Sequence, residues 1–315
     1  MKKRILVVSS ANMDMVQNVS RVPYSGETIL EHGGTYSYVP GGKGANSAIT
    51  MARLGADCVF MCKVGDDPNG KKLTSLYKSE RIDTRYMIVD RETPTGLASI
   101  LVESGGANRI IVFPGANGTM TGKDVEGAFN CYPDAVYLQF EIPDEAVLEA
   151  CRIAHRKGIP IFVDAAPARE DFPLRELAPV EMFSLNETET MIFTGIDPKN
   201  DANCLRASIK LRNVTGAKYV VLKLGARGAF LFDGEEFYNF PAEKVNVVDT
   251  TAAGDVFTAA LTCYYVENGN IGAAIRFGNA AAALSVSKAG ASSSIPTLAE
   301  LNEYKKEKEE GSPAE

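Results

Sequence analysis

The feature that most constrains the fold is an alternation of short apolar segments with helical segments in the second half of the chain. The predicted strands are 135–138, 160–163, 182–185 and 219–222. The predicted helices are 144–157, a segment from 187 onward, 201–213, 253–266 and 271–288. Short apolar strands separated by helices are typical of a parallel sheet covered on both faces. We therefore expect an α/β fold with a mostly parallel central sheet.

The first half of the chain has a different pattern. A strand at 5–9 and a helix at 44–54 fit the main sheet, but 13–40 combines glycine and proline with β-prone residues. The segment 95–113 holds two β-prone runs joined by a polar turn that contains glycine, which predicts a hairpin. We interpret 13–40 and 95–113 as a small β-sheet lid on a single domain that spans 1–315.

Composition and charge narrow the classes of function. A net charge of −7 without a basic run disfavours nucleic-acid binding. No apolar stretch approaches the ~20 residues that span a membrane, and the apolar run within 2–8 is too short for a signal peptide. Six scattered cysteines without a C-x-x-C pair indicate reduced thiols in a cytoplasmic protein. His32 and His155 lie away from every motif described below, which disfavours a Ser-His-Asp hydrolase or a zinc enzyme.

The strongest chemical motif is the segment 248–257, with the sequence VDTTAAGDVF. Its small residues come directly before a predicted helix, and free backbone N–H groups at a helix N-terminus attract anions. Asp255 places a carboxylate beside this predicted anion site, an arrangement that suits phosphoryl transfer to a hydroxyl group. The same spacing also fits an ordinary helix cap with small residues for close packing, so the motif alone leaves both interpretations open.

A glycine-rich segment, 41–46, opens a second predicted helix. It is not a Walker A loop, because Gly44 stands where Ser or Thr follows the lysine, and no G-x-G-x-x-G follows the first strand. Its glycines allow close approach to the backbone, and Lys43 and Asn46 offer donors to hydroxyl groups. A tight turn with a helix cap is the alternative.

A third motif, 185–189, places Asn186 and Glu189 on one face of a starting helix. Oxygen ligands of this kind suit Mg²⁺ that is held largely through water. The alternative is an N-cap with a glutamate in the first turn, and the motif in isolation favours that alternative.

Other polar residues follow predicted strands. Asn12 and Asp14 come after the first strand, and Glu141 comes after the strand at 135–138. The carboxyl ends of parallel strands are where α/β sheets bind ligands, so these side chains could bind the vicinal hydroxyls of a sugar. The loop 224–228 follows another strand and could bring its backbone and Arg227 to nucleotide phosphates. For each residue alone, a surface or turn position is the alternative.

Taken together, these segments resemble the PfkB family of carbohydrate kinases, of the ribokinase type. The resemblance runs through nearly the whole chain, from 12–14 to Gly290 and Ala291. Each piece alone is weak, but the combination is specific. The matching segments are 12–14, 41–46, 95–96, 115–117, 138–141, 167–169, 186–189 and 249–255.

The resemblance implies a ribokinase-like three-layer α/β/α sandwich with a β-sheet lid, and lids that often clasp two copies into a homodimer. It implies that Asp255 takes the proton of the sugar 5-hydroxyl, and that the backbone of Ala252, Ala253 and Gly254 forms the anion hole. The positions that match sugar-binding residues of the family are Asn12, Asp14, Gly41, Gly42, Lys43, Asn46, Glu141 and Asp255.

The resemblance also implies ATP, Mg²⁺ and an activating monovalent cation, usually K⁺. The positions on the nucleotide side are Asn186, Lys223, Gly225, Arg227, Gly228, Ala253, Gly254 and Asn279. Glu189 would hold Mg²⁺ through water. The positions for the monovalent cation, mostly through carbonyl groups, are Asp249, Thr251, Ser285, Lys288, Gly290 and Ser294.

The chain departs from the family pattern in a few places. Leu185 stands where the family usually has Pro before Asn-x-x-Glu, and Pro there would only preset the backbone. Asn279 stands where ribokinases often have His, so the adenine contact can differ. The cation-binding positions also vary in residue type, a change that carbonyl ligands tolerate.

The sequence leaves three hypotheses for the function. The first is a kinase for D-ribose, favoured by Asn12, whose amide can serve the region of the ribose 2-hydroxyl. The second is a PfkB-type kinase for another substrate, such as deoxyribose, fructose, 2-keto-3-deoxygluconate or a nucleoside. Ala98, Ile100 and Ile111 are expected to line the pocket, and the sequence does not define the shape that they give it. The third is a non-catalytic sugar-binding protein, which the intact segment around Asp255 disfavours.

Overall fold

The computed structural model describes residues 2–177 and 179–310. Eight of the described strands form the main sheet, in the order β14-β13-β12-β11-β10-β9-β1-β4. Six of them run parallel, and β13 and β14 are added antiparallel at one edge. These strands are β1 (Arg4–Val8), β4 (Asp57–Met61), β9 (Ala135–Leu138), β10 (Ile161–Asp164), β11 (Met182–Asn186), β12 (Tyr219–Lys223), β13 (Ala229–Phe232) and β14 (Phe237–Phe240).

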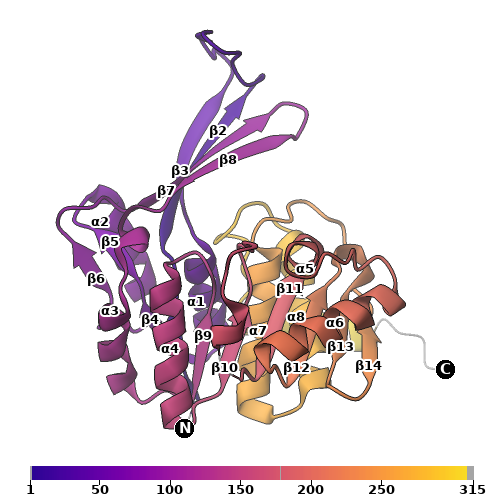
Figure 1. Ribbon diagram of the computed structural model, residues 1–315. Coiled ribbons are helices and arrows are strands. Elements are labelled where there is room, and N and C mark those ends of the chain that lie inside the picture. The colour runs from indigo at the N-terminus through magenta and orange to yellow at the C-terminus, as the bar shows by residue number, and fades with distance from the viewer. Residues whose placement is uncertain (1, 178, 311–315) are drawn as a thin grey trace.

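Helices cover both faces of this sheet, so the body of the molecule has three layers (Figure 1). The core on one face is built with α3 (Gly122–Glu126), α4 (Asp144–Lys157), α5 (Glu187–Thr194) and α6 (Asp201–Thr215). The core on the other face is built with α1 (Lys43–Arg53), α2 (Pro68–Ser79), α7 (Ala253–Asn268), α8 (Ile271–Val286) and α9 (Leu298–Glu310). The α/β/α sandwich expected from the alternating pattern is confirmed.

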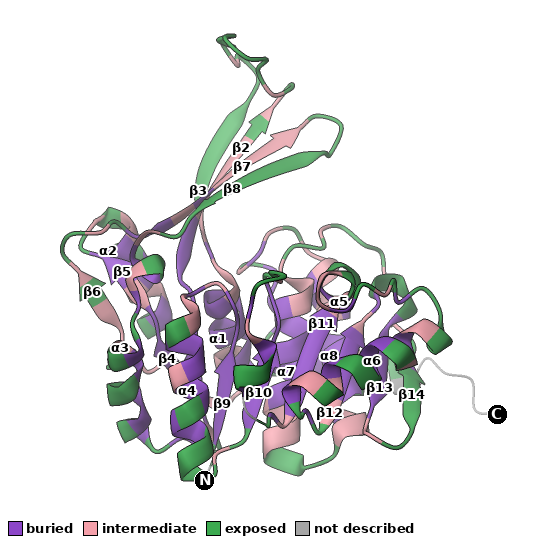
Figure 2. Cartoon of the chain, viewed as in Figure 1, coloured by how far each residue is buried: buried purple, intermediate pink, exposed green. Residues whose placement is uncertain are grey.

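A second sheet projects from this body (Figure 1). Its described strands follow the order β3-β2-β7-β8, and they are β2 (Asn12–Val19), β3 (Thr35–Gly41), β7 (Gly96–Glu103) and β8 (Asn108–Phe113). We call these four strands the projecting sheet. They lie almost wholly within the segments predicted to form a lid. Figure 2 shows that β8 is exposed along its whole length.

Two short parallel strands, β5 (Lys63–Gly65) and β6 (Ile88–Asp90), pair beside the base of the projecting sheet. Short 3₁₀ turns connect other elements. They are Gly115–Thr119, Gly127–Cys131, Leu174–Leu177 and Gly225–Arg227. In the described ranges, no helix combines the length and the apolar character that crossing a bilayer requires.

The topology brings the predicted motifs to one edge of the main sheet. The parallel strands start near the N-terminus of the chain and end beneath the projecting sheet, where α1 and α7 begin (Figure 1). The strand β1 leads directly to β2, and β3 leads directly to α1. The segments that carry Asn12, Lys43 and Asp255 therefore meet at the carboxyl edge of the sheet, where α/β folds bind their ligands.

Candidate active site

The centre of the site is the carboxylate of Asp255, in the first turn of α7. It is buried, and its two oxygens accept hydrogen bonds from two different elements. The Nδ2 atom of Asn46 on α1 donates to Oδ2 at 2.9 Å, and Nε2 of Gln139 after β9 donates to Oδ1 at 3.4 Å. Burial is the largest effect on this carboxyl and raises the pKa of Asp255, although the nearby charge of Lys43 opposes the shift. A carboxylate with a raised pKa is a better proton acceptor.

The backbone before Asp255 leaves donors free. Ala252 has a left-handed conformation with φ of 62°, which is uncommon for a residue with a side chain. The N–H of Ala253 donates to the carbonyl of Thr250 at 3.2 Å, but no acceptor within the described residues takes the N–H groups of Ala252, Gly254 or Asp255. Free N–H groups at a helix N-terminus attract an anion. Of the three residues predicted to form the anion hole, Ala253 thus has its N–H already occupied.

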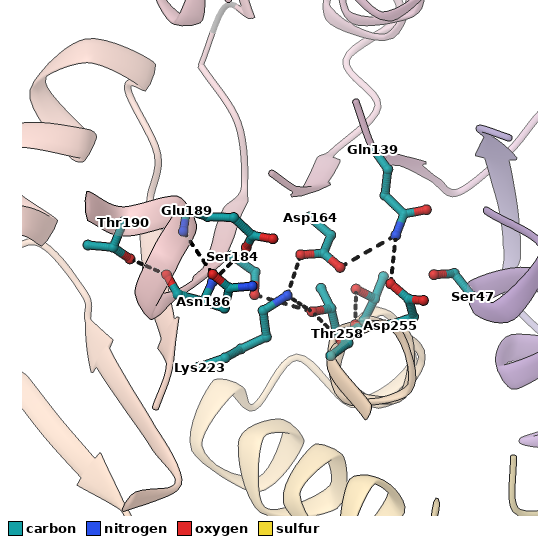
Figure 3. A network of polar contacts seen from close by, with 12 residues as sticks. Ser47, Gln139, Asp164, Ser184, Asn186, Glu189, Thr190, Lys223, Asp255 and Thr258 are labelled. Carbon is teal, nitrogen blue, oxygen red and sulfur yellow. Dashed lines mark hydrogen bonds and ion pairs between the residues drawn. The ribbon is translucent and has the colours of Figure 1, made fainter. Parts of the chain in front are cut away.

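A lysine lies against this turn. The ammonium of Lys223, at the end of β12, donates to Oδ1 of Asp164 at the end of β10 (Figure 3). It also lies 3.4 Å from Oγ1 of Thr258, one turn into α7. Burial opposes the charge of Lys223, but the carboxylates of Asp164 and Glu189 outweigh burial and raise the pKa of Lys223. The site therefore holds a cation next to the free N–H groups.

The predicted sugar-binding residues gather around Glu141. Its Oε2 accepts the backbone N–H of Lys43 at 3.1 Å and lies 3.5 Å from Nδ2 of Asn12. The hydroxyl of Ser10 donates a short hydrogen bond to the same oxygen. The Nδ2 atom of Asn117 donates to Oδ1 of Asn12 at 2.7 Å, so the amide of Asn12 is held with its amino group toward Glu141. The structure thus brings Asn12, Lys43 and Glu141 together at one place.

Unpaired charge is concentrated on the sugar side. Burial, with the negative charges of Glu141 and Asp255, raises the pKa of Asp14 to about 7. The negative charge of Asp255 is the main cause that raises the pKa of Lys43. The Asp14 carboxyl also lies over Gly41, where any side chain would collide with it. One buried acceptor, Oδ1 of Asn46, has no partner among the described atoms, and a hydroxyl of a bound sugar could satisfy it.

On the nucleotide side, Asn186 and Glu189 form a capping box. The backbone N–H of Asn186 donates to Oε2 of Glu189 at 2.7 Å, and the N–H of Glu189 donates to Oδ1 of Asn186 at 2.8 Å. The alternative interpretation of this motif as a helix cap therefore describes the structure. The cap also fixes the carboxylate of Glu189 near Lys223 and Asp164 (Figure 3). Burial raises the pKa of Glu189, and Lys223 opposes the shift.

The remaining residues predicted to bind nucleotide have structural partners. Gly228 has φ of 90°, and a side chain there would collide with the backbone at Phe240. The guanidinium of Arg227 donates to the carboxylate of Glu187 at 2.9 Å and to the carbonyl of Pro198 at 2.7 Å. The Nδ2 atom of Asn279 donates to the carbonyls of Phe240 and Pro241, at 3.3 Å and 3.0 Å. Its amide therefore holds the segment after β14 in place.

The predicted positions for a monovalent cation also come together. The N–H groups of Val248 and Asp249 donate to the carbonyl of Val286, and the N–H of Gly290 donates to Oδ2 of Asp249 at 2.9 Å. Burial disfavours the charge of Asp249, but hydrogen bonds from Thr251 and Gly290 outweigh burial and lower the pKa of Asp249.

Three other predicted cation-site residues point to protein partners. The hydroxyls of Ser285 and Ser294 bond to each other at 2.9 Å. The ammonium of Lys288 turns to Glu300 at 2.6 Å. The ammonium of Lys288 is therefore turned to another residue, and carbonyl groups remain the ligands expected from these positions.

No group of three or more His, Cys, Asp or Glu side chains in the described parts of the chain could hold a metal ion. The carboxylates of Glu189 and Asp164 nevertheless lie close to each other. The charge of Asp164 raises the pKa of Glu189, and both carboxylates raise the pKa of Lys223. Two carboxylates suit Mg²⁺ that keeps most of its water and gains ligands from a phosphate.

Comparison with known proteins assigns the family. The model of the "pfkB family carbohydrate kinase" matches residues 2–298. The chain belongs to this family. The pfkB-family chain is 36% identical over 306 residues to the ribokinase of Staphylococcus aureus, covering 96% of the chain and 100% of the relative. It is 37% identical over 298 residues to a bifunctional ribokinase/ribose-5-phosphate isomerase A of Fructilactobacillus sanfranciscensis, and there it spans 94% of its own length but 55% of the relative.

The fold agrees with the same family. The structure of the Arabidopsis thaliana ribokinase in complex with ribose and ATP superposes with a TM-score of 0.88 at 33% identity, covering 96% of this chain and 99% of the other. The chain is thus a carbohydrate kinase with the ribokinase-like fold, as the sequence predicted.

Four polar residues of the site had no predicted role. Asn117 and Gln139 lie in segments that match the family, 115–117 and 138–141, but the match assigned them no role. Ser10 and Asp164 are single polar residues near strand ends and belong to no matched segment. Their signal is a polar residue directly after an apolar run, as in Ile161–Asp164. That signal is shared by many surface turns.

Proposed function

We propose that this pfkB-family kinase transfers the γ-phosphate of ATP to the 5-hydroxyl of D-ribose, giving D-ribose 5-phosphate and ADP. The observation that carries the proposal is the position of Asp255. Its buried carboxylate lies between the free N–H groups of α7 and the polar cluster around Glu141. A proton acceptor between an anion site and a sugar-type site is what phosphoryl transfer to a hydroxyl requires.

In this mechanism Asp255 accepts the proton of the attacking hydroxyl. Asn46 and Gln139 fix the carboxylate, because each donates to a different oxygen. The buried position raises the pKa of Asp255, which favours proton transfer from a hydroxyl. The free N–H groups of Ala252 and Gly254 bind the charge that develops on the phosphoryl oxygens. ATP supplies the phosphoryl group.

We assign the sugar contacts to the cluster around Glu141. Asn12, Asp14 and Lys43 offer both donors and acceptors to vicinal hydroxyls. The free Oδ1 atom of Asn46 supports an additional hydroxyl donor. The amino group of Asn12 favours ribose over deoxyribose, since only one of its two N–H groups can reach Glu141 and a missing hydroxyl would leave the other buried donor without an acceptor.

We infer that Mg²⁺ is held through water by Glu189, with Asp164 beside it, and that K⁺ is held mainly by carbonyl groups near Asp249 and Gly290. The capping box fixes Glu189 in place, and the hydrogen bond between Gly290 and Asp249 joins the two segments of the cation site. Titration of activity with KCl in a potassium-free buffer tests the second assignment. Equal activity without K⁺ would remove the cation from the account.

A substrate panel tests the proposed function. A coupled assay of ADP release with ribose, deoxyribose, fructose, 2-keto-3-deoxygluconate and nucleosides, with and without K⁺, gives kcat/KM for each. We expect ribose to have the highest value. A higher value for another member of the panel would move the assignment to that substrate within the same family.

We also propose that the projecting sheet closes over the bound sugar. The strand β2 carries Asn12 and Asp14 at its base, so sugar binding and the position of this sheet act on the same strand. Closure would exclude water from the site and prevent ATP hydrolysis. We expect ribose to slow proteolysis within 20–34, the loop at the tip. Unchanged cleavage with saturating ribose would argue against closure.

We infer that the protein works in the cytoplasm. We also infer that two copies form a homodimer through the projecting sheet. Its edge strands β3 and β8 expose apolar side chains, including Tyr36 at 73%, Ile111 at 56% and Phe113 at 54%. An open, apolar sheet edge is a surface that a second copy can cover. We expect Ile111→Lys to give a monomer in sedimentation velocity, whereas Val89→Lys, 53% exposed on β6, leaves the state of the wild type. A monomeric wild type would contradict the inference.

A further inference from the structure

A buried ion pair lies directly beside the candidate base. The side chains of Lys223 and Asp164 are 12% and 0% exposed, and they contact each other at the ends of β12 and β10, across the end of β11. Burying two charges costs the free energy of their hydration, and their mutual attraction offsets this cost only in part. Apolar side chains of similar volume could fill the same space, so stability alone does not account for this pair.

The lysine faces the predicted anion site. Gly254 has no side chain, and an atom at the position of a Cβ there would lie 3.5 Å from Nζ of Lys223. The hydroxyl of Thr258 links the turn at Gly254 to Lys223, because it donates to the carbonyl of Gly254 at 3.1 Å and lies 3.4 Å from the ammonium. An oxygen bound over Gly254 would therefore be within reach of both the free N–H groups and the ammonium.

The aspartate connects this cation to the base. One oxygen of Asp164 binds Lys223, and the other lies 3.5 Å from Nε2 of Gln139. The same Nε2 atom lies 3.4 Å from Oδ1 of Asp255 (Figure 3). The hydroxyl of Ser9 donates to Oε1 of Gln139 at 3.0 Å, which fixes the orientation of that amide. A continuous chain of polar contacts thus joins the ammonium to the candidate base.

We propose that Lys223 is the cationic residue that contacts the transferring phosphoryl group, and that Asp164 is a positioning residue that holds the ammonium at the anion site. This inference rests on the kinase function proposed above. The sugar oxygen bonds to phosphorus, the bond from phosphorus to the leaving oxygen of ADP breaks, and the hydroxyl proton goes to Asp255. Lys223 keeps all its protons and stabilises the charge on the phosphoryl oxygens.

The pair also acts on the pH dependence of the base. Asp255 is faced by Lys43 from α1, Asp164 from β10, Lys223 from β12 and Asp14 from β2. The charge of Asp164 raises the pKa of Asp255, and the charge of Lys223 lowers it. Loss of Asp164 should therefore move the acid limb of the kcat/KM profile to lower pH, and loss of Lys223 should move it to higher pH.

The experiment compares Lys223→Met, Lys223→Arg and Asp164→Asn with the wild type, using ribose and ATP from pH 5.5 to 9. We expect Lys223→Met to lower kcat by about 10²–10³-fold, the effect of removing one donor to a developing oxyanion, with the KM for ribose little changed. Arginine should restore part of kcat because it keeps the charge. Asp164→Asn should lower kcat less than Lys223→Met does, and the two acid limbs should move in opposite directions.

A second variant covers a failure to fold. Lys223→Met leaves the charge of Asp164 buried without its cation, which is strongly destabilising, whereas the double variant Lys223→Met/Asp164→Asn removes both charges. We expect the folded double variant to be as slow as Lys223→Met. Wild-type kcat in either folded variant, or acid limbs that do not move, would overturn the inference. A wild-type enzyme without ribose turnover would instead refute the proposed substrate.

Discussion

Adding one methyl group at Gly254 tests the anion site without disturbing the fold. The nearest atoms to an added Cβ are Nζ of Lys223 at 3.5 Å and its Cδ and Cε at 3.9 Å, all ordinary contact distances. Gly254 lies in the first turn of α7 with a φ that alanine adopts. Alanine at such a position stabilises a folded protein by about 0.4–1 kcal/mol, because it restricts the unfolded chain.

The same methyl group fills the space between the backbone of Gly254 and the ammonium of Lys223. It would keep a phosphoryl oxygen from touching both, and loss of one such contact costs about 10²–10³-fold in kcat. We therefore expect Gly254→Ala to unfold at an equal or higher urea concentration than the wild type but to turn over ribose about 10²–10³-fold more slowly.

A matched control is available at Gly127. It has helical φ and ψ of −61° and −30°, and an added Cβ there meets nothing within 4 Å. Gly127→Ala should therefore keep the kcat of the wild type and gain stability by a similar amount, about 0.4–1 kcal/mol. Wild-type kcat in Gly254→Ala would refute the anion site at α7, and a clear loss of stability in that variant would refute the packing argument.

Two further predictions concern the sugar side. Because burial and nearby carboxylates raise the pKa of Asp14 to about 7, the folded state holds a proton that the unfolded state releases near pH 4, and wild-type stability falls as pH rises between these values. Asp14→Asn should therefore gain stability over the wild type at pH 8 relative to pH 5, by at most about 3 kcal/mol in urea unfolding, and an equal difference at both pH values would contradict the shift. Asn12→Leu should lower kcat/KM for ribose by about 10-fold or more and change deoxyribose little, since Asn117 keeps its bond to the carbonyl of Ala11. Equal losses with both sugars would mean that Asn12 does not contact the 2-hydroxyl.

Much of the fold follows from local sequence rules. The helix predicted at 144–157 is α4 with the same bounds, since Pro143 precedes it and Gly158 ends it in a left-handed conformation. The strands β9 to β12 are apolar runs of four or five residues between helices, and they were found within a residue or two. The antiparallel pair β13 and β14 was missed, although Asp233 and Gly234 between them are a hairpin signal.

The site was predictable where residues form a spaced motif and not where they meet only in space. Asp255 and Asn46 belong to segments of small residues that open helices, and the structure joins them by a hydrogen bond. Asp164 belongs to no matched segment, and Gln139 lies in the matched segment 138–141 without a predicted role. Only the order of strands in the sheet brings both residues to the base. Asn279 and Arg227 match nucleotide-binding positions of the family, but their side chains have partners within this chain. Asn279 donates to the carbonyls of Phe240 and Pro241, and Arg227 donates to Glu187 and to the carbonyl of Pro198.

The most direct test of the central claim is the turnover of Asp255→Asn. The substitution keeps the shape of the side chain, and the amide of Asn46 can rotate to offer its unpartnered Oδ1 to the new NH₂ group, so the fold should persist. We expect single-turnover phosphorylation of ribose to slow by about 10²–10⁴-fold, with the affinity for ATP little changed. A rate within a few-fold of the wild type would show that another group accepts the hydroxyl proton.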